Sequence, residues 1–293
     1  MNFEAIVDFK ENIKDYKNDF WLNKFNFDEK DKSKYKVYDV KIPEILKIDV
    51  RNIIKSHILN SFAIKINFKL NASLHIKDDD EFYIISNPML KERVFKVPMI
   101  RGSSIKGALL KAAIKIFKEE NKPEDLGSIF RIFGIGNNEY RELFDTNDKI
   151  IENKILIFLA LEIGITFKKG VEEQLKDYFK IKSQKGRAIF YPIYFDRLSL
   201  EVINTHNRKT KVGTKPIFYE VVSKGSEGKL QIVYIPFDGV TKSNDEIKKE
   251  AKNDLEFLQK CINKVAQNGI GAKTKLGWGK FEIEKKECIW SER

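Results

Sequence analysis

The chain has 293 residues, and its 54 Lys and Arg exceed its 43 Asp and Glu, which gives a formal net charge of +11. Hydrophobic residues make up 42% of the chain, which excludes a disordered polymer and suffices for one large domain or two modest ones. The cysteines, Cys261 and Cys288, do not form a CxxC pair, so neither a zinc site nor a disulfide framework is indicated. No apolar run reaches the roughly 18 residues of a membrane span, and the charged residues 1–35 do not resemble a signal peptide. We therefore expect a cytoplasmic protein with no membrane partner, no metal and no cofactor.

The excess of positive charge indicates a polyanionic partner, because clustered Lys and Arg attract phosphates without sequence specificity. The chain is also rich in Lys, Ile and Asn together, a composition expected of an AT-rich genome. Both explanations of the charge stay open at the level of composition.

The first half of the chain changes pattern at residue 61. Residues 1–60 are charged and aromatic, and we expect a mainly helical extension there, followed by a separate region over residues 61–293. Apolar residues then recur at every second position, which predicts a half-buried strand: Phe62, Ile64, Ile66, Phe68 and Leu70. Ser103 or Ser104 is expected to cap a helix with an apolar stripe. Residues 119–150 are expected to form a polar connection with short helices.

The second half contains further strands and one long helix. We expect a strand over 153–164, a short helix over 169–180 and a strand over 188–203. Residues 218–222 and 230–237 are predicted to pair through a turn at 224–228. Ser243 is expected to cap a helix that ends at Asn268-Gly269, and a last strand is expected over 278–283. Strands and helices that do not repeat as βα units predict an α+β fold.

The most informative stretch is a loop between this last helix and the last strand, with glycines at positions 269, 271, 277 and 279. Glycine permits positive φ angles and a close approach of the backbone to a ligand. Exposed N–H groups with nearby lysines can hold phosphates, and the predicted contacts are Gly269, Gly271, Lys273 and Lys275. The order is neither that of a Walker loop nor that of a dinucleotide fingerprint. A glycine-rich turn with solvated lysines is the alternative.

Two further segments could contact phosphate. The first begins the predicted helix near residue 102, where the helix dipole favours anions; its candidate residues are Arg101, Gly102, Ser103, Ser104 and Lys106. The second follows a strand and contains His206 and Arg208, which could contact a phosphate or a base. A simple helix cap and a solvated loop are the respective alternatives.

Candidates for catalysis are few. The three histidines, His57, His75 and His206, lack HExxH spacing, so zinc hydrolysis is not supported. Asp78, Asp79 and Asp80 could gather magnesium, although we prefer an exposed acidic turn. We assign no catalytic or metal-binding residue.

Three segments in order carry a family resemblance: Leu74-His75-Ile76, Ser86-Asn87-Pro88, and Val97 to Gly107 with the sequence VPMIRGSSIKG. They resemble the RAMP superfamily of CRISPR proteins, in which a strand and loop lead into a P-x-I-x-G-S-S-x-K-G helix start. The GIGAKTKLGWG segment over residues 269–279 resembles the glycine-rich loop of that superfamily.

The resemblance implies one or two ferredoxin-like (RRM-like) modules in residues 61–293. It also implies a subunit of a type III effector complex of the Csm or Cmr type, with guide RNA (crRNA) and other RAMP subunits as partners. In that family the subunits that cut target RNA carry Asp before the Asn-Pro step. Ser86 stands there in this chain, which implies a non-catalytic subunit. The GIGAKT form of the loop and residues 203–208 are most similar to the single-copy subunit at the 3′ end of the guide RNA.

Three alternatives remain open. The first is a metal-independent endoribonuclease that processes precursor crRNA, which would need His57 or His206 as the proton carrier. The second is a target-cleaving backbone subunit that uses the acidic residues at 78–80. The third is an adaptor that contacts protein subunits but not RNA.

Overall fold

The computed structural model describes residues 38–55, 58–78, 87–120, 122–135, 155, 184–206, 213–239 and 242–291. The chain divides into two compact units, Met1–Lys36 and Val37–Arg293, and the described residues belong to the second. The extension predicted over residues 1–60 therefore lies partly within the second unit. There it forms three short elements: β1 (Tyr38–Asp39), the 3-10 helix η2 (Glu44–Leu46) and α2 (Val50–Ile54). The helices predicted before residue 38 lie outside the described residues.

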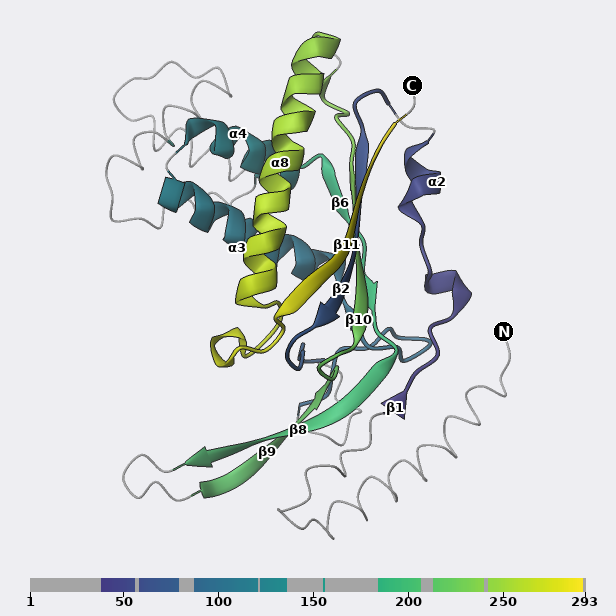
Figure 1. Ribbon diagram of the computed structural model, residues 1–293, viewed down its shortest axis with the longest axis vertical. Coiled ribbons are helices and arrows are strands. Elements are labelled where there is room, and N and C mark those ends of the chain that lie inside the picture. Colours follow the sequence, from purple (N-terminus) through teal and green to yellow (C-terminus); the bar gives the residue numbers. More distant parts are fainter. Residues whose placement is uncertain are drawn as a thin grey trace. The chain divides into compact units, whose positions relative to one another are not determined.

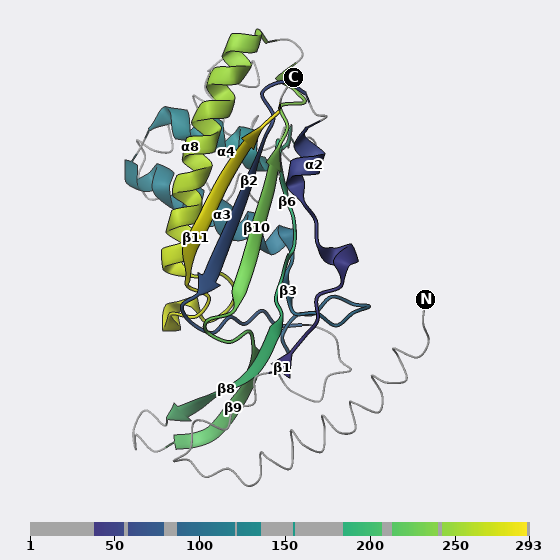
Figure 2. The same cartoon turned by 45° about the vertical axis from the view of Figure 1, so that its right-hand side comes forward.

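A four-stranded antiparallel sheet forms the centre of this unit, in the strand order β11-β2-β10-β6 (Figure 1, Figure 2). Its strands are β2 (Phe62–Leu70), β6 (Ala188–Phe190), β10 (Glu227–Tyr234) and β11 (Phe281–Trp290). The alternation predicted from residue 62 is confirmed. The five residues of the predicted alternation are each at most 1% exposed, because every second side chain of the strand points into the core.

Helices cover one face of this sheet (Figure 1): α3 (Gly102–Glu120), α4 (Pro123–Phe133) and α8 (Asn244–Asn268). Their apolar side chains and those of β2 and β10 form one core, in which Phe62 stacks on Tyr234 with ring centroids 4.5 Å apart. On the other face, α2 packs Val50 and Ile54 against Ala63 and Val233. The combination of helices with antiparallel sheet confirms the α+β class.

The long helix α8 begins and ends where its sequence predicts. Ser243 is the N-cap, and it forms a capping box in which Ser243 and Glu246 each accept the other's backbone N–H. The helix ends at Asn268, and the next residue, Gly269, has φ 90°. The two boundaries of this helix thus coincide with the capping residues that its sequence offers.

The predicted hairpin of residues 218–222 with 230–237 is wrong. Residues 218–221 belong to β9 (Gly213–Val221), which pairs with β8 (Arg197–His206), whereas β10 pairs with β2 and β6. A turn at 223–226 separates β9 from β10, with the Gly225 N–H donated to the Leu70 carbonyl. β10 then pairs with β2 along its whole length, from Glu227 opposite Lys69 to Tyr234 opposite Phe62. β10 thus lies inside the central sheet, between β2 and β6.

The strand predicted over 188–203 is broken into three. β6 is followed by β7 (Ile193–Tyr194), and then by β8, which begins at Arg197. Pro192 lies in the first break and cannot donate to a strand ladder. β7 pairs with β3 (Met99–Ile100), β1 pairs with β8, and β4 (Gly134–Ile135) pairs with β5 (Gln184–Lys185).

Three predicted boundaries also differ from those observed. α3 begins at Gly102, so Ser103 and Ser104 lie in its first turn and do not cap it. The last strand covers 281–290 rather than 278–283, and Trp278 precedes it in the loop. Residues 119–135 contain the end of α3 and all of α4.

Some predictions fall on residues that are not described. The helix over 169–180 and the strand over 153–164 lie outside the described residues, apart from Ile155, which is helical and fully buried. At that one position the expectation of a strand is wrong. No helix in the described part of the chain is long and apolar enough to cross a membrane.

Candidate RNA-binding site

The glycine-rich loop begins at the end of α8 and folds back on itself before β11. Gly279 has φ 71°, and a Cβ there would lie 1.9 Å from the Ile270 carbonyl oxygen. At Gly269 a Cβ would lie 2.3 Å from the Trp278 carbonyl oxygen. The Ile270 N–H is donated to the Gly279 carbonyl at 3.0 Å. Glycine is thus required at positions 269 and 279 because the two ends of the loop touch each other.

The same loop is fixed to the segment that follows β2. The Ala272 N–H is donated to the His75 carbonyl at 2.8 Å, and the Gly279 N–H to the Ser73 carbonyl at 2.9 Å. At Gly271, a Cβ would lie 2.6 Å from the His75 carbonyl oxygen. Several N–H groups of the loop are therefore used within the protein: Ile270, Ala272, Leu276, Gly277, Trp278 and Gly279.

The exposed groups of the loop are mainly cations. Lys273, Lys275 and Lys280 are exposed, and Leu276 between them is 63% exposed. Lys273 has a left-handed backbone with φ 61°. The loop can thus hold a phosphate mainly through its ammonium groups, since many of its backbone amides already have acceptors.

The start of α3 presents the second group of predicted residues. Arg101 and Ser103 are exposed, whereas Gly102, Ser104 and Lys106 are half-buried. A Cβ on Gly102 would lie 2.1 Å from the Phe190 carbonyl oxygen, so glycine lets this helix start lie directly on β6. The first turn is closed by the Arg101 carbonyl, which accepts from Ser104 and Ile105.

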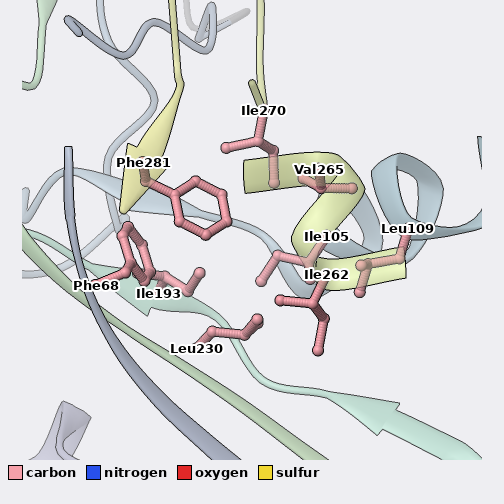
Figure 3. A pocket seen from close by; sticks show the side chains of 9 residues that line it. All are labelled: Phe68, Ile105, Leu109, Ile193, Leu230, Ile262, Val265, Ile270 and Phe281. Atoms are coloured by element: carbon pink, nitrogen blue, oxygen red, sulfur yellow. The ribbon is translucent and has the colours of Figure 1, made fainter. Parts of the chain in front are cut away.

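The loop and the start of α3 meet through their buried sides. Ile105 of α3 and Ile270 of the loop line the same apolar cavity of about 20 Å³, together with Phe281 and other core residues (Figure 3). The cavity is too small for a ligand, and it connects the two predicted segments at one end of the core. The buried sides of the two segments thus pack into the same part of the core.

The third predicted segment is more remote. His206 is the last residue of β8 and pairs with Gly213 of β9, while Arg208 lies outside the described residues. Tyr219, opposite Glu201 in the same hairpin, contacts the loop through Lys273 and Trp278. From Glu201 to His206 the strand extends by roughly 17 Å, at about 3.4 Å per residue. The contact with the loop thus lies at the Glu201–Tyr219 pair, and His206 is several residues further along β8.

Sequence reasoning missed an aromatic cluster under the loop. His75 and Tyr219 are 2% and 7% exposed, and their ring centroids are 5.2 Å apart. Trp278 meets both rings at nearly right angles, with centroids 6.4 Å from His75 and 5.6 Å from Tyr219. His75 stands in a segment that carries the family resemblance, but no pattern in β9 distinguishes Tyr219 from an ordinary strand residue.

Burial lowers the pKa of His75 below its ordinary value of 6.5. The ring Nδ1–H donates to the Glu220 carbonyl at 2.9 Å, which fixes the tautomer of the neutral ring. The carboxylate of Glu220 is itself buried, where it pairs with Lys91 and accepts the Met89 N–H at 2.9 Å. These contacts make His75 a packing residue of the site.

The acidic and histidine candidates do not form a metal site among the described residues. Asp78 accepts the Lys91 N–H at 3.4 Å, and no group of three His, Cys, Asp or Glu suited to a metal is found in the described part of the chain. Asp79, Asp80, Ser86 and His57 lie outside the described residues, as does the side chain of His206.

Comparison with known proteins gives relatives that share most of the chain. The chain is 22% identical over 227 residues to the protein named CRISPR system Cms endoribonuclease Csm3 from Streptococcus thermophilus, covering 74% of this chain and 84% of that protein. A chain of the type III-B Cmr-beta complex, solved bound to cognate target RNA, matches 82% of this chain with 13% identity and a TM-score of 0.42. This chain spans 63% of that longer one. Cmr6 from Pyrococcus furiosus matches 77% of this chain, and 99% of its own, with 18% identity and a TM-score of 0.37.

The family assignment rests on a match over most of the described unit. The model of the RAMP superfamily matches residues 67–282, from the middle of β2 to the start of β11. The matched range includes the start of α3, the hairpin of β8 and β9, and the whole glycine-rich loop. The chain is a member of the RAMP superfamily.

Proposed function

We propose that this chain binds single-stranded RNA as a non-catalytic subunit of a type III CRISPR effector complex, where it contacts the 3′ region of the crRNA. The observation that carries the proposal is the exposed pair Lys273 and Lys275 on a loop whose glycines and hydrogen bonds fix its backbone. Membership of the RAMP superfamily supports it, as does the similarity to Csm3. Other RAMP subunits of the complex are the proposed protein partners.

The contact to RNA would run from the loop to the start of α3. Lys273 and Lys275 would neutralise phosphates on one side, and Arg101, Ser103 and Lys106 on the other. Gly269, Gly271, Gly102 and Ser104 would shape the backbone beneath the contact. His206 and Arg208, further along the hairpin of β8 and β9, would contact a more distant part of the RNA. Cationic contacts of this kind give affinity without sequence specificity.

The proposed ferredoxin-like module corresponds to the central sheet and two of its helices. In chain order these are β2, α3, β6, β10, α8 and β11, with the remaining elements as insertions. This is a strand-helix-strand-strand-helix-strand order, which supports the proposal of such a module.

Salt dependence of RNA binding tests the proposal directly. Affinity for single-stranded RNA should fall with salt at a log–log slope of roughly −0.7 per neutralised phosphate. Lys273→Ala with Lys275→Ala should reduce that slope by about 1.4, because two contacts are lost. The measurement is fluorescence anisotropy with labelled RNA over a salt series.

A matched control removes the same charge from another surface. Lys248 and Lys252 are exposed on α8, and Lys248→Ala with Lys252→Ala should leave the slope close to that of the wild type. Equal losses in both double variants would mean that only net charge matters, and the proposed site would be wrong.

A catalytic role is the second candidate, because the similar Csm3 is named an endoribonuclease. A target-cutting subunit would need carboxylates such as Asp78, Asp79 and Asp80, whereas a metal-independent processing enzyme would need His57 or His206. Incubation with target RNA and with repeat RNA, each in Mg²⁺ and in EDTA, separates the two. We expect the RNA to stay intact in all four reactions. If repeat RNA is cleaved in EDTA and His57→Ala or His206→Ala abolishes that cleavage, the chain is the processing enzyme instead.

A further inference from the structure

Tyr219 lies where the hairpin of β8 and β9 contacts the glycine-rich loop. It stands in β9 opposite Glu201 of β8, and the Glu201 carboxylate accepts the Ser73 hydroxyl at 2.7 Å. Ser73 in turn accepts the N–H of Gly279 through its carbonyl. The hairpin that carries Tyr219 is therefore linked through β8 and Ser73 to the loop that carries Lys273.

The ring of Tyr219 has a fixed orientation. His75 and Trp278 approach it at interplanar angles of 79° and 87°, and the ring is 7% exposed. His75 is itself held by its hydrogen bond to the Glu220 carbonyl. Edge-to-face contacts from two neighbours leave the ring little freedom to rotate away.

The Lys273 ammonium lies over this ring, with Nζ 5.3 Å from the ring centroid. A cation at this distance is attracted by the negative face of an aromatic ring. The backbone of Lys273 is also fixed, because its carbonyl accepts the N–H groups of Leu276 at 2.8 Å and Trp278 at 3.4 Å. Both ends of this long side chain are thus held in place.

Lysine side chains in solution lose considerable rotamer freedom when they bind, which weakens a phosphate contact. A lysine that already rests on a ring has lost part of that freedom before RNA arrives. Lys275, two residues along the loop, is exposed and has no ring contact within the described residues. The two lysines should therefore contribute differently to RNA binding.

We propose that Tyr219 is a positioning residue that holds the Lys273 ammonium in place for one RNA phosphate. This inference rests on the proposed function, and it adds a residue of β9 that does not itself need to touch the RNA. The side chain of Lys273 would thus be ordered before RNA binds, whereas that of Lys275 would become ordered only on binding.

A double-mutant cycle between Tyr219 and Lys273 tests the inference, with affinity for single-stranded RNA as the readout. Tyr219→Leu should weaken binding about two- to fivefold, the range of an exposed cation–π contact converted to affinity. Tyr219→Phe should bind like the wild type, because the ring face remains. Lys273→Arg should also retain binding, since a guanidinium stacks on aromatic rings. Combining Tyr219→Leu with Lys273→Ala should be no worse than Lys273→Ala alone.

Controls separate positioning from general loss of structure. Tyr191→Leu removes a half-buried ring packed on the opposite face of the sheet and should leave RNA binding unchanged. Thermal unfolding and circular dichroism report whether each variant keeps its structure. If Tyr219→Leu does not fold, NMR of the wild-type chain answers the question. The Lys273 ε-methylene protons should then show an upfield ring-current shift, and its absence would contradict the inference.

The outcomes distinguish the two proposals. If Lys273→Ala leaves the affinity and its salt slope unchanged, RNA does not contact this loop and the proposed function is wrong. If Lys273→Ala weakens binding but Tyr219→Leu does not, only the role of Tyr219 is wrong. Losses that multiply in the double variant would show that Tyr219 acts independently of Lys273, which also overturns the inference.

Discussion

His75 lies beneath the proposed site as a neutral ring among charged neighbours. Burial lowers the pKa of this ring, and the charges of Lys273 and Lys77 lower it further, whereas the hydrogen bond to the Glu220 carbonyl and the charge of Glu220 act in the opposite direction. A proton added here would place a cation close to Lys273 in a buried environment. We therefore expect the stability of the loop region to depend on the protonation of this one residue.

The pH dependence follows from the direction of that pKa shift. Because the folded-state pKa lies below the ordinary 6.5, the unfolded chain takes up the proton first as the pH falls. The contribution of His75 to stability is thus present above about pH 6.5 and declines below it. His75→Asn keeps a donor near the Glu220 carbonyl but cannot titrate, so its melting temperature should fall less between pH 7 and pH 5 than that of the wild type. Parallel curves for the two proteins would contradict this assignment.

Gly279 and Gly277 offer a matched pair of residues with positive φ. A Cβ on Gly279 would overlap the Ile270 carbonyl oxygen, whereas nothing lies within 4 Å of a Cβ on Gly277, at φ 86°. Gly277→Ala should cost about 1–2 kcal/mol through backbone strain alone. Gly279→Ala should cost roughly 3 kcal/mol or more, because a steric clash is added. Urea unfolding measures both, and equal losses would mean that the loop ends do not touch in solution.

At the scale of elements, a buried polar network ties α4, α8 and β10 together near the middle of α8. Asp254 of α8 is fully buried and accepts three hydrogen bonds from Arg131, two from Nε at 2.9 and 3.2 Å and one from Nη2 at 2.6 Å. The hydroxyl of Tyr234 in β10 donates to the same carboxylate at 2.6 Å. Removal of the carboxylate would leave a guanidinium without its buried partner.

Asp254→Ala should therefore destabilise the protein by roughly 3–5 kcal/mol, the usual cost of breaking a buried ion pair on one side. Asp245→Ala, which removes an exposed carboxylate from the first turn of the same helix, should cost at most about 1 kcal/mol. Replacing both partners, with Arg131→Met and Asp254→Leu, should cost less than Asp254→Ala alone. Chemical unfolding of the three variants provides the test, and a neutral Asp254→Ala would show that the network does not support the fold.

At the scale of the whole molecule, the features predicted well are those set by nearby residues. The alternation in β2 and the capping box of α8 depend on neighbours within a few positions, and both are observed. The strand assigned to 188–203 failed because short breaks at 191–192 and 195–196 redirect the chain into three different sheets. The helix cap predicted at Ser103 or Ser104 is wrong by two or three residues, since close contact with β6 lets α3 begin at Gly102.

The sequence by itself determined the α+β class, the long capped helix, the positive charge and the motifs of the RAMP superfamily. Only the tertiary structure decided that β10 joins β2 rather than β9, because the choice of strand partner depends on apolar surface contributed by distant parts of the chain. It also decided that Tyr219 lies beneath Lys273 and beside His75. These residues come from three separate segments, and their contact exists only because the loop, the end of β2 and the hairpin pack against one another. The sequence pattern of a single segment does not predict that contact.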